Sequence, residues 1–192
     1  MMRWLLCCAV LLLSGCQSLQ QSSDNCVALS EQVQQCLAPL PWSASGQPLV
    51  TELLQQLSVD RADSHHELTS SLEFTPTQMT VVGIAPLGQA LFTVQYDGST
   101  LTSQQSLLLG DNFRPDYLMA MLQLIYWPQT MLDKSITGAK LSEGRCDEQR
   151  CRRLTRGNQL IAEIRYQQPD AWHSAVVLHL PIAKLQLTIQ PL

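Results

Sequence analysis

The sequence predicts a mainly β protein of the α+β class, with a large antiparallel sheet wrapped over central helices. Two observations support this fold. Apolar and polar residues alternate with a period of two on both sides of the middle of the chain, as in half-buried strands. The middle itself, after Pro115, carries a dense run of Leu and Met residues that is typical of a helix. The helices are too few for a parallel sheet with crossover helices.

The chain before the first of these strands is expected to be helical or irregular. The apolar residues of 27–37 recur near one side of a short helix, with Asp24 or Asn25 as its cap and Pro39 at its end. A second helical or irregular piece is expected over 49–57.

Four consecutive strands follow, and further strands return after the helical middle. Asp97-Gly98 is a strong hairpin signal, and Gly157-Asn158 marks a second turn. The expected strands lie at 66–74, 78–85, 90–96, 101–107, 140–143, 151–156, 159–166, 175–180 and 184–189.

The central helix is expected to begin near Pro115, where the missing N–H of proline costs nothing. It ends at Tyr126-Trp127-Pro128, and Pro128 can start another turn through Met131. This helix is apolar over most of its surface. It can therefore be simple core, or it can line an apolar cavity inside the curved sheet.

The N-terminus has the order of a secretory signal, with Arg3, an apolar run over 5–13 and small residues before Cys16. The run is too short to span a bilayer core of about 30 Å. The ending Leu-Ser-Gly-Cys resembles the lipobox of bacterial lipoproteins, which implies that Cys16 is acylated and becomes the first mature residue. The alternative is an ordinary signal with a chance cysteine. The expected organisation is a signal peptide (1–15), a lipidated flexible tether (16–25) and a single domain (26–192).

The residue after Cys16 indicates which membrane holds the anchor. In enterobacterial lipoproteins an Asp at this position retains the protein in the inner membrane, whereas this chain has Gln17. By that resemblance we expect a lipid-anchored protein on the periplasmic face of the outer membrane.

Cysteine usage agrees with an oxidising compartment. Of seven cysteines, two leave with the signal and Cys16 is committed to lipid, so four remain. Of the three possible connectivities, the local one, Cys26–Cys36 with Cys146–Cys151, is favoured. The rival interpretation is a zinc site of four cysteines, which the absence of tight C-x₂-C knuckles disfavours. We expect no metal.

The charge balance argues against nucleic acid as a partner, because 12 basic residues face 16 acidic ones. The basic residues are nevertheless clustered. A solvated hairpin tip is the favoured interpretation of this cluster, and a patch for anionic lipid or another protein is the alternative. The clustered residues are Arg145, Arg150, Arg152, Arg153 and Arg156.

Sequence motifs of catalysis are missing, so we expect no enzyme and no cofactor. G-x-S-x-G, S-x-x-K and HExxH do not occur. His65-His66-Glu67 could suggest a metal site, but adjacent residues of an extended chain point to opposite faces.

The stretch QMTVVGIAPLGQALFTVQYDG, over 78–98, resembles the outer-membrane lipoprotein receptor LolB. Part of this stretch also recurs together with a Leu-rich helix that ends in a Trp-Pro pair. The residues concerned are Pro86, Leu87, Gly88, Gln89, Leu91, Phe92, Thr93, Trp127 and Pro128. In this order along the chain they resemble an uncharacterised family of bacterial lipoproteins, domain-of-unknown-function family 3261, and the likeness extends over about 67–189.

The resemblance implies an incomplete antiparallel β-barrel closed by helices around an apolar cavity, a LolA/LolB-like fold. In the receptor the cavity takes acyl chains of lipoproteins. Members of the uncharacterised family are often encoded with enzymes of aryl polyene synthesis. The implied partners are an acyl or polyene lipid and proteins of lipoprotein sorting or polyene export.

The expected function is therefore binding or transfer of a lipid-like ligand, acyl or aryl polyene, in an apolar cavity. The alternative is a structural or adaptor lipoprotein that holds a periplasmic complex at the membrane. The residues expected to line the cavity are Val82, Ile84, Phe92, Leu118, Met121, Leu122, Ile125, Trp127 and Met131.

Overall fold

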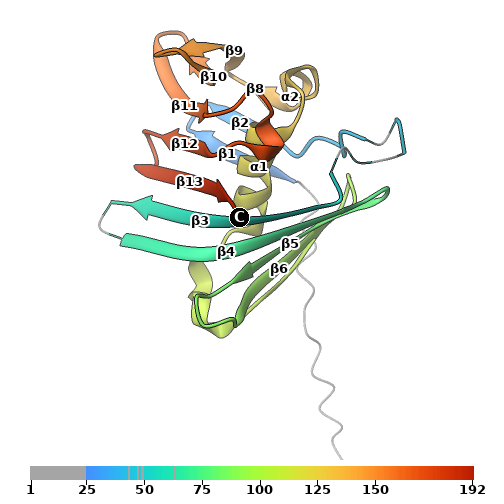
Figure 1. The fold of residues 1–192 in the computed structure, drawn as a ribbon. Coiled ribbons are helices and arrows are strands. Elements are labelled where there is room, and N and C mark those ends of the chain that lie inside the picture. The colour runs from blue at the N-terminus through green and yellow to red at the C-terminus, as the bar shows by residue number, and fades with distance from the viewer. Residues whose placement is uncertain (1–24, 43, 47, 49, 63) are drawn as a thin grey trace, which may run out of the picture.

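The computed structural model describes residues 25–192, apart from residues 43, 47, 49 and 63 (Figure 1). The expected signal peptide and Cys16 lie outside the described residues, as does all of the expected tether except Asn25.

Ten strands of the described chain form one antiparallel sheet, in the order β7-β6-β5-β4-β3-β13-β12-β11-β10-β9. The predicted mainly β, antiparallel fold is confirmed. Strands β7 and β9 form the two edges, so the sheet is open. The strands are β3 (Glu52–Arg61), β4 (Ser64–Thr75), β5 (Gln78–Ile84), β6 (Ala90–Tyr96), β7 (Leu101–Gln105), β9 (Lys140–Cys146), β10 (Gln149–Arg156), β11 (Gln159–Tyr166), β12 (Val176–Leu180) and β13 (Leu185–Pro191).

A second sheet of three strands contains β1 (Cys26–Ser30), β2 (Val33–Cys36) and β8 (Ile136–Thr137). The helix expected over 27–37 is therefore wrong. Cys26 lies directly opposite Cys36 in the β1–β2 hairpin, and the two form a disulfide. A helix of this length would hold its ends about 15 Å apart, too far for that bond.

The prediction of a helical or irregular segment over 49–57 is also wrong from Glu52 onward, because strand β3 begins at that residue. Ten residues of β3 pair with β4, from Glu52 opposite Glu73 to Arg61 opposite Ser64. The residues Leu53, Gln55 and Leu57 alternate inward and are buried. Every second side chain of this segment is buried against the helix, and a strand is the conformation that places alternate side chains on one face.

Four helical segments interrupt the strands in the described chain: η1 (Leu107–Asn112), α1 (Pro115–Tyr126), α2 (Gln129–Ser135) and η2 (Ala171–His173). The expected central helix is confirmed, with Pro115 in its first turn. It ends at Tyr126, and Trp127 is extended because a residue before a proline disfavours the helical conformation.

Helix α1 lies against one face of the large sheet, with the segment that contains β1 and β2 beyond it (Figure 1). Hydrogen bonds join that segment to the helix. The amide of Gln123 pairs with the backbone of Ala38 in both directions, at 2.8 and 2.9 Å. The Tyr117 hydroxyl donates to the Ala28 carbonyl at 2.6 Å. Side chains from all three layers form one buried cluster around α1.

The C-terminus of α1 is capped by an arginine from the sheet. Nη1 of Arg152 donates to the carbonyl oxygens of Leu124, Ile125 and Trp127, at 2.9, 3.2 and 2.8 Å. Its Nε and Nη2 both lie 2.7 Å from a carboxylate oxygen of Glu143. The last carbonyls of a helix have no partner within the helix, and the negative end of its dipole favours a cation.

The interpretation of the arginine cluster as a solvated hairpin tip is thus wrong for Arg152, whose side chain is only 4% exposed. It holds for Arg153, which is 47% exposed and pairs with Glu163. Adjacent residues of a strand point to opposite faces. One arginine of this pair therefore enters the core and the other faces solvent.

Both predicted disulfides, Cys26–Cys36 and Cys146–Cys151, are present. The second closes the turn between β9 and β10, the hairpin that carries Arg152. Each bond closes a short loop, so each stabilises a local hairpin rather than joining distant parts of the sheet.

We expect Arg152→Met to lower the free energy of unfolding by about 3 kcal/mol, since three buried carbonyls lose their donor. Chemical denaturation followed by circular dichroism measures this. The matched control is Arg153→Met, which removes only an exposed ion pair and should cost less than about 1 kcal/mol. Equal losses in the two variants would contradict the capping role.

Candidate functional site

The structure separates the nine predicted cavity residues into three groups. Phe92, Leu118, Leu122, Ile125 and Trp127 are buried. Met121 and Met131 are half-buried and pack against the core. Val82 and Ile84 are half-buried on the other face of β5.

Val82 and Ile84 therefore do not face α1. Their neighbours Met79 and Val81 are buried on the inner face of β5. Gly83 also points inward, because a Cβ there would lie 2.2 Å from the ring of Phe92. Phe92 thus fills the space over the glycine.

The C-terminal half of α1 ends in a packed group of aromatic rings. Trp127 lies 6.2 Å from Trp42 and 6.4 Å from Trp172, and its indole donates to the Pro39 carbonyl at 2.7 Å. Tyr126 stacks on Trp172 at 4.5 Å. These rings are core residues, and Trp127 lines no cavity between them. The sequence prediction missed Trp42 and Trp172 because both lie far from the helix along the chain.

Partly buried apolar side chains instead occur just before α1 and on one face of it. Tyr117 and Met121 are four residues apart, on one face of the helix. Phe113, just before the helix, stacks on Phe92 at 4.5 Å, and Leu109 packs against the same core. We name Leu109, Phe113, Tyr117 and Met121 the apolar stripe. These four side chains are only partly buried, so apolar surface is accessible along the stripe.

Three leucines next to the stripe are strongly exposed. They are Leu107 (100%), Leu87 (92%) and Leu108 (71%), and we name them the leucine tip. Leu87 lies in the turn between β5 and β6, and the other two begin η1. β6 pairs with β7, and the Ser106 amide donates to the Leu91 carbonyl at 2.7 Å, so both turns lie at one end of the sheet (Figure 1).

A small polar group lies inside the core between the sheet and α1. Gln55 faces Ser70 across β3 and β4, and its Nε2 donates to the Tyr126 hydroxyl at 2.8 Å. The Gln55 Oε1 and the Ser70 Oγ have no hydrogen-bond partner among the described residues. Burial raises the pKa of Tyr126, which keeps its hydroxyl neutral. This group can take one further hydrogen-bonding atom.

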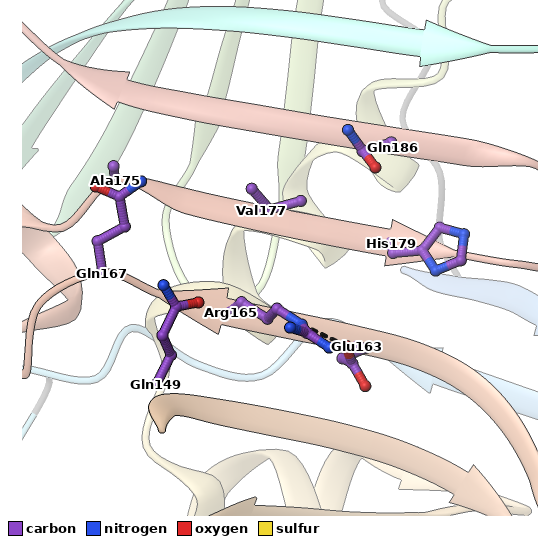
Figure 2. A pocket seen from close by; sticks show the side chains of 8 residues that line it. All are labelled: Gln149, Glu163, Arg165, Gln167, Ala175, Val177, His179 and Gln186. Carbon is purple, nitrogen blue, oxygen red and sulfur yellow. Dashed lines mark hydrogen bonds and ion pairs between the residues drawn. The ribbon is translucent and has the colours of Figure 1, made fainter. Parts of the chain in front are cut away.

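The outer face of the sheet carries a hollow of about 320 Å³ over β10 to β13 (Figure 2). Figure 2 shows Glu163 and Arg165 on β11 opposite Val177 and His179 on β12. The small side chains of Ala175 and Val177 leave this space between longer polar neighbours. Most of its lining side chains are polar or charged, and it lies on the face away from α1, so it is not the apolar cavity that the sequence predicts.

The charged pair beside this hollow is held in a network. Glu163 accepts from Nε of Arg165 at 2.7 Å and from Nε of Arg153 at 2.8 Å. Nη1 of Arg165 also reaches Asp147 at 2.9 Å. Burial acts to raise the pKa of Glu163, but the hydrogen bonds from Arg165 and Arg153 outweigh it, and the pKa lies below its ordinary value. A carboxylate held in this way is a structural anion rather than a proton acceptor.

One comparison with known proteins decides the family. A family model described as a protein of unknown function, DUF3261, matches residues 52–192. The chain belongs to this family. The match begins with β3, so the DUF3261 domain contains the ten-stranded sheet and helices α1 and α2, whereas the β1–β2 hairpin precedes it. No curated protein matches the chain.

The predicted kinship with the DUF3261 family is thereby confirmed, whereas the likeness to the lipoprotein receptor stays a prediction. In the described part of this DUF3261 protein, no three His, Cys, Asp or Glu residues are placed to hold a metal ion. His65 instead contacts Asp60 at 2.6 Å and Glu67 at 3.4 Å, both exposed. None of the helices in the described chain has the length and apolar character to cross a membrane.

The Glu163 network predicts a defined pH dependence of stability. A carboxylate whose folded pKa is lowered stabilises the fold above its unfolded pKa, and this contribution is lost as the pH falls through the folded value. We expect Glu163→Gln to cost about 1 kcal/mol at pH 7. The difference from wild type should shrink below about pH 4, where the carboxylate becomes protonated.

Urea denaturation at several pH values measures this difference. Glu31→Gln, in the exposed turn between β1 and β2, is the matched control, since no ion pair of Glu31 is present among the described residues. A Glu163→Gln deficit that stays constant from pH 7 to pH 3 would show that the charge of Glu163 contributes nothing.

Proposed function

We propose that this DUF3261 protein is a lipoprotein, anchored through Cys16 to the periplasmic face of the outer membrane, that binds or transfers a lipid-like ligand. The ligand is an acyl or aryl polyene chain. The proposal is for a binding protein rather than an enzyme. The anchor rests on the sequence alone, and the ligand class rests on the sequence and on the arrangement of apolar side chains around α1.

The observation that carries the proposal is the partly exposed apolar surface of Tyr117 and Met121 on one face of α1. The rest of the helix from Leu118 to its C-terminal end is buried, and so is Trp127 after it. Tyr117 and Met121 remain partly exposed although they are largely apolar. A long hydrocarbon chain gains about 0.8 kcal/mol for each CH₂ that it buries. The apolar stripe offers such burial, and Met121 can adapt to chains of different shape.

The residues that we propose to contact the ligand differ in part from those that the sequence predicts. We propose that the ligand lies along Leu109, Phe113, Tyr117 and Met121, between β1, whose Ala28 carbonyl binds the Tyr117 hydroxyl, and Phe113, which stacks on the buried Phe92. Val82 and Ile84 take no part, because they lie on the other face of β5. A deeper position, past Leu122 and Ile125, would require the packed core to open.

An adaptor without a ligand is the second candidate. The packed aromatic group around Trp127 favours it, as does the network of Arg153, Glu163, Arg165 and Asp147 on the outer face. That network presents alternating charges on a sheet surface, as a polar protein contact would require.

A fluorescent polyene fatty acid, cis-parinaric acid, separates these two functions. We expect its fluorescence to rise on binding to the purified protein, and Met121→Lys to weaken binding at least tenfold, because a charge would lie in the stripe. The matched control is Met131→Lys on α2, also half-buried, which should bind like wild type. Circular dichroism checks that both variants fold. A wild-type protein that leaves the probe unchanged would favour the adaptor.

The anchor is tested independently of the ligand. Metabolic labelling with an alkyne-tagged palmitate should mark the wild-type chain in its bacterial host, and Cys16→Ala should abolish the label because the acylated thiol is lost. Cys8→Ala is the control, since Cys8 belongs to the expected signal peptide and should leave the label intact. Labelled Cys16→Ala protein would refute the lipobox.

A further inference from the structure

None of the three leucines of the tip belongs to the buried core of the described chain or packs against it. Leu107, Leu108 and Leu87 are the three most exposed large apolar residues of the described chain, at 100%, 71% and 92%. Solvent-exposed apolar side chains that cluster mark an interaction site. These three come from two separate turns that lie at one end of the sheet (Figure 1).

The backbone holds the tip in place. The Ser106 Oγ accepts from the Leu108 amide at 3.3 Å, and the Leu109 amide donates to the Ser106 carbonyl at 3.1 Å. The Leu109 side chain packs into the core, so η1 is attached by its third leucine while the first two point outward. The tip is therefore presented to a partner by a defined turn.

We propose that the leucine tip inserts into the surface of a lipid bilayer and seats the apolar stripe at that surface. Leu109 directly follows Leu107 and Leu108 in η1, and Phe113 is the first residue after η1, ahead of Tyr117 and Met121 in α1. A hydrocarbon chain moving between the bilayer and the stripe would then stay in contact with apolar groups. This inference deepens the proposed function, on which its choice of a membrane rests.

The number of side chains favours a bilayer over a protein partner. A stable protein interface uses about 20–30 residues on each side and requires matching shape. Three projecting leucines fall far below that number. A bilayer needs no complementary shape, and it gains from each apolar side chain that enters the boundary between headgroups and acyl chains.

The length of chain between Cys16 and the domain permits this orientation. The Asn25 side chain donates to the Ser99 carbonyl, in the turn after β6, which lies at the end of the strand opposite to the tip. The seven residues of β6 span about 24 Å at about 3.4 Å each. The ten residues 16–25 can reach about 35 Å when extended. An anchor at Cys16 and the tip can therefore enter the same bilayer.

Tryptophan scanning tests the proposal in the full, lipidated chain. We would reconstitute Leu107→Trp and Leu87→Trp in vesicles of phosphatidylethanolamine and phosphatidylglycerol with brominated acyl chains. Both new tryptophans should show blue-shifted emission and at least twofold quenching by bromine. The native Trp42, Trp127 and Trp172 are buried and form a common background. The matched control is Thr77→Trp, in the exposed turn at the other end of β5, which should stay unquenched.

Each outcome decides the proposal. Emission of Leu107→Trp and Leu87→Trp that matches Thr77→Trp would overturn it, and a protein would then be the occupant of the tip. Equal quenching of Thr77→Trp and Leu107→Trp would overturn it as well, because both ends of the sheet would then contact the bilayer to the same extent and the tip would not orient the domain. Quenching of the tip together with a failure to bind parinaric acid would retain the membrane contact and reject the proposed ligand.

Discussion

The fold depends on the contact between the buried guanidinium of Arg152 and the end of α1. A short apolar helix that ends inside a protein leaves several carbonyls without partners. Arg152 supplies donors to three of them, and the Tyr166 hydroxyl donates to the Ile125 carbonyl at 2.7 Å. Both residues come from the β10–β11 hairpin. This contact fixes the C-terminus of α1 to one half of the sheet.

The same contact makes the helix asymmetric. Near Arg152, rings such as Trp127 and Trp172 fill the space between helix and sheet. Toward the other end, Tyr117 and Met121 keep apolar surface accessible. The exposed Leu107 and Leu108 of η1 also precede this end of the helix. The fixed end of α1 is therefore packed, whereas partly exposed apolar side chains lie before and along the rest of it.

Local signals in the sequence predicted much of this fold. Strands β6 and β11 have the expected bounds, because turns with glycine flank them and their residues alternate. The pairing of Cys26 with Cys36 was also predicted from short spacing and is present. That pairing was incompatible with the helix expected between the same two cysteines. The sequence thus contained the signal for the β1–β2 hairpin.

The sequence by itself determined the strands of the large sheet other than β3, the central helix, the disulfides and the membership of the DUF3261 family, because alternation, prolines and spacing act over a few residues. Only the tertiary structure decided which side chains face α1. Successive apolar residues such as Val81 and Val82 fit either face of a strand, and the register with neighbouring strands selects one. It likewise decided that Arg152 enters the core, because its partners are backbone carbonyls of a distant helix, and no local pattern encodes these.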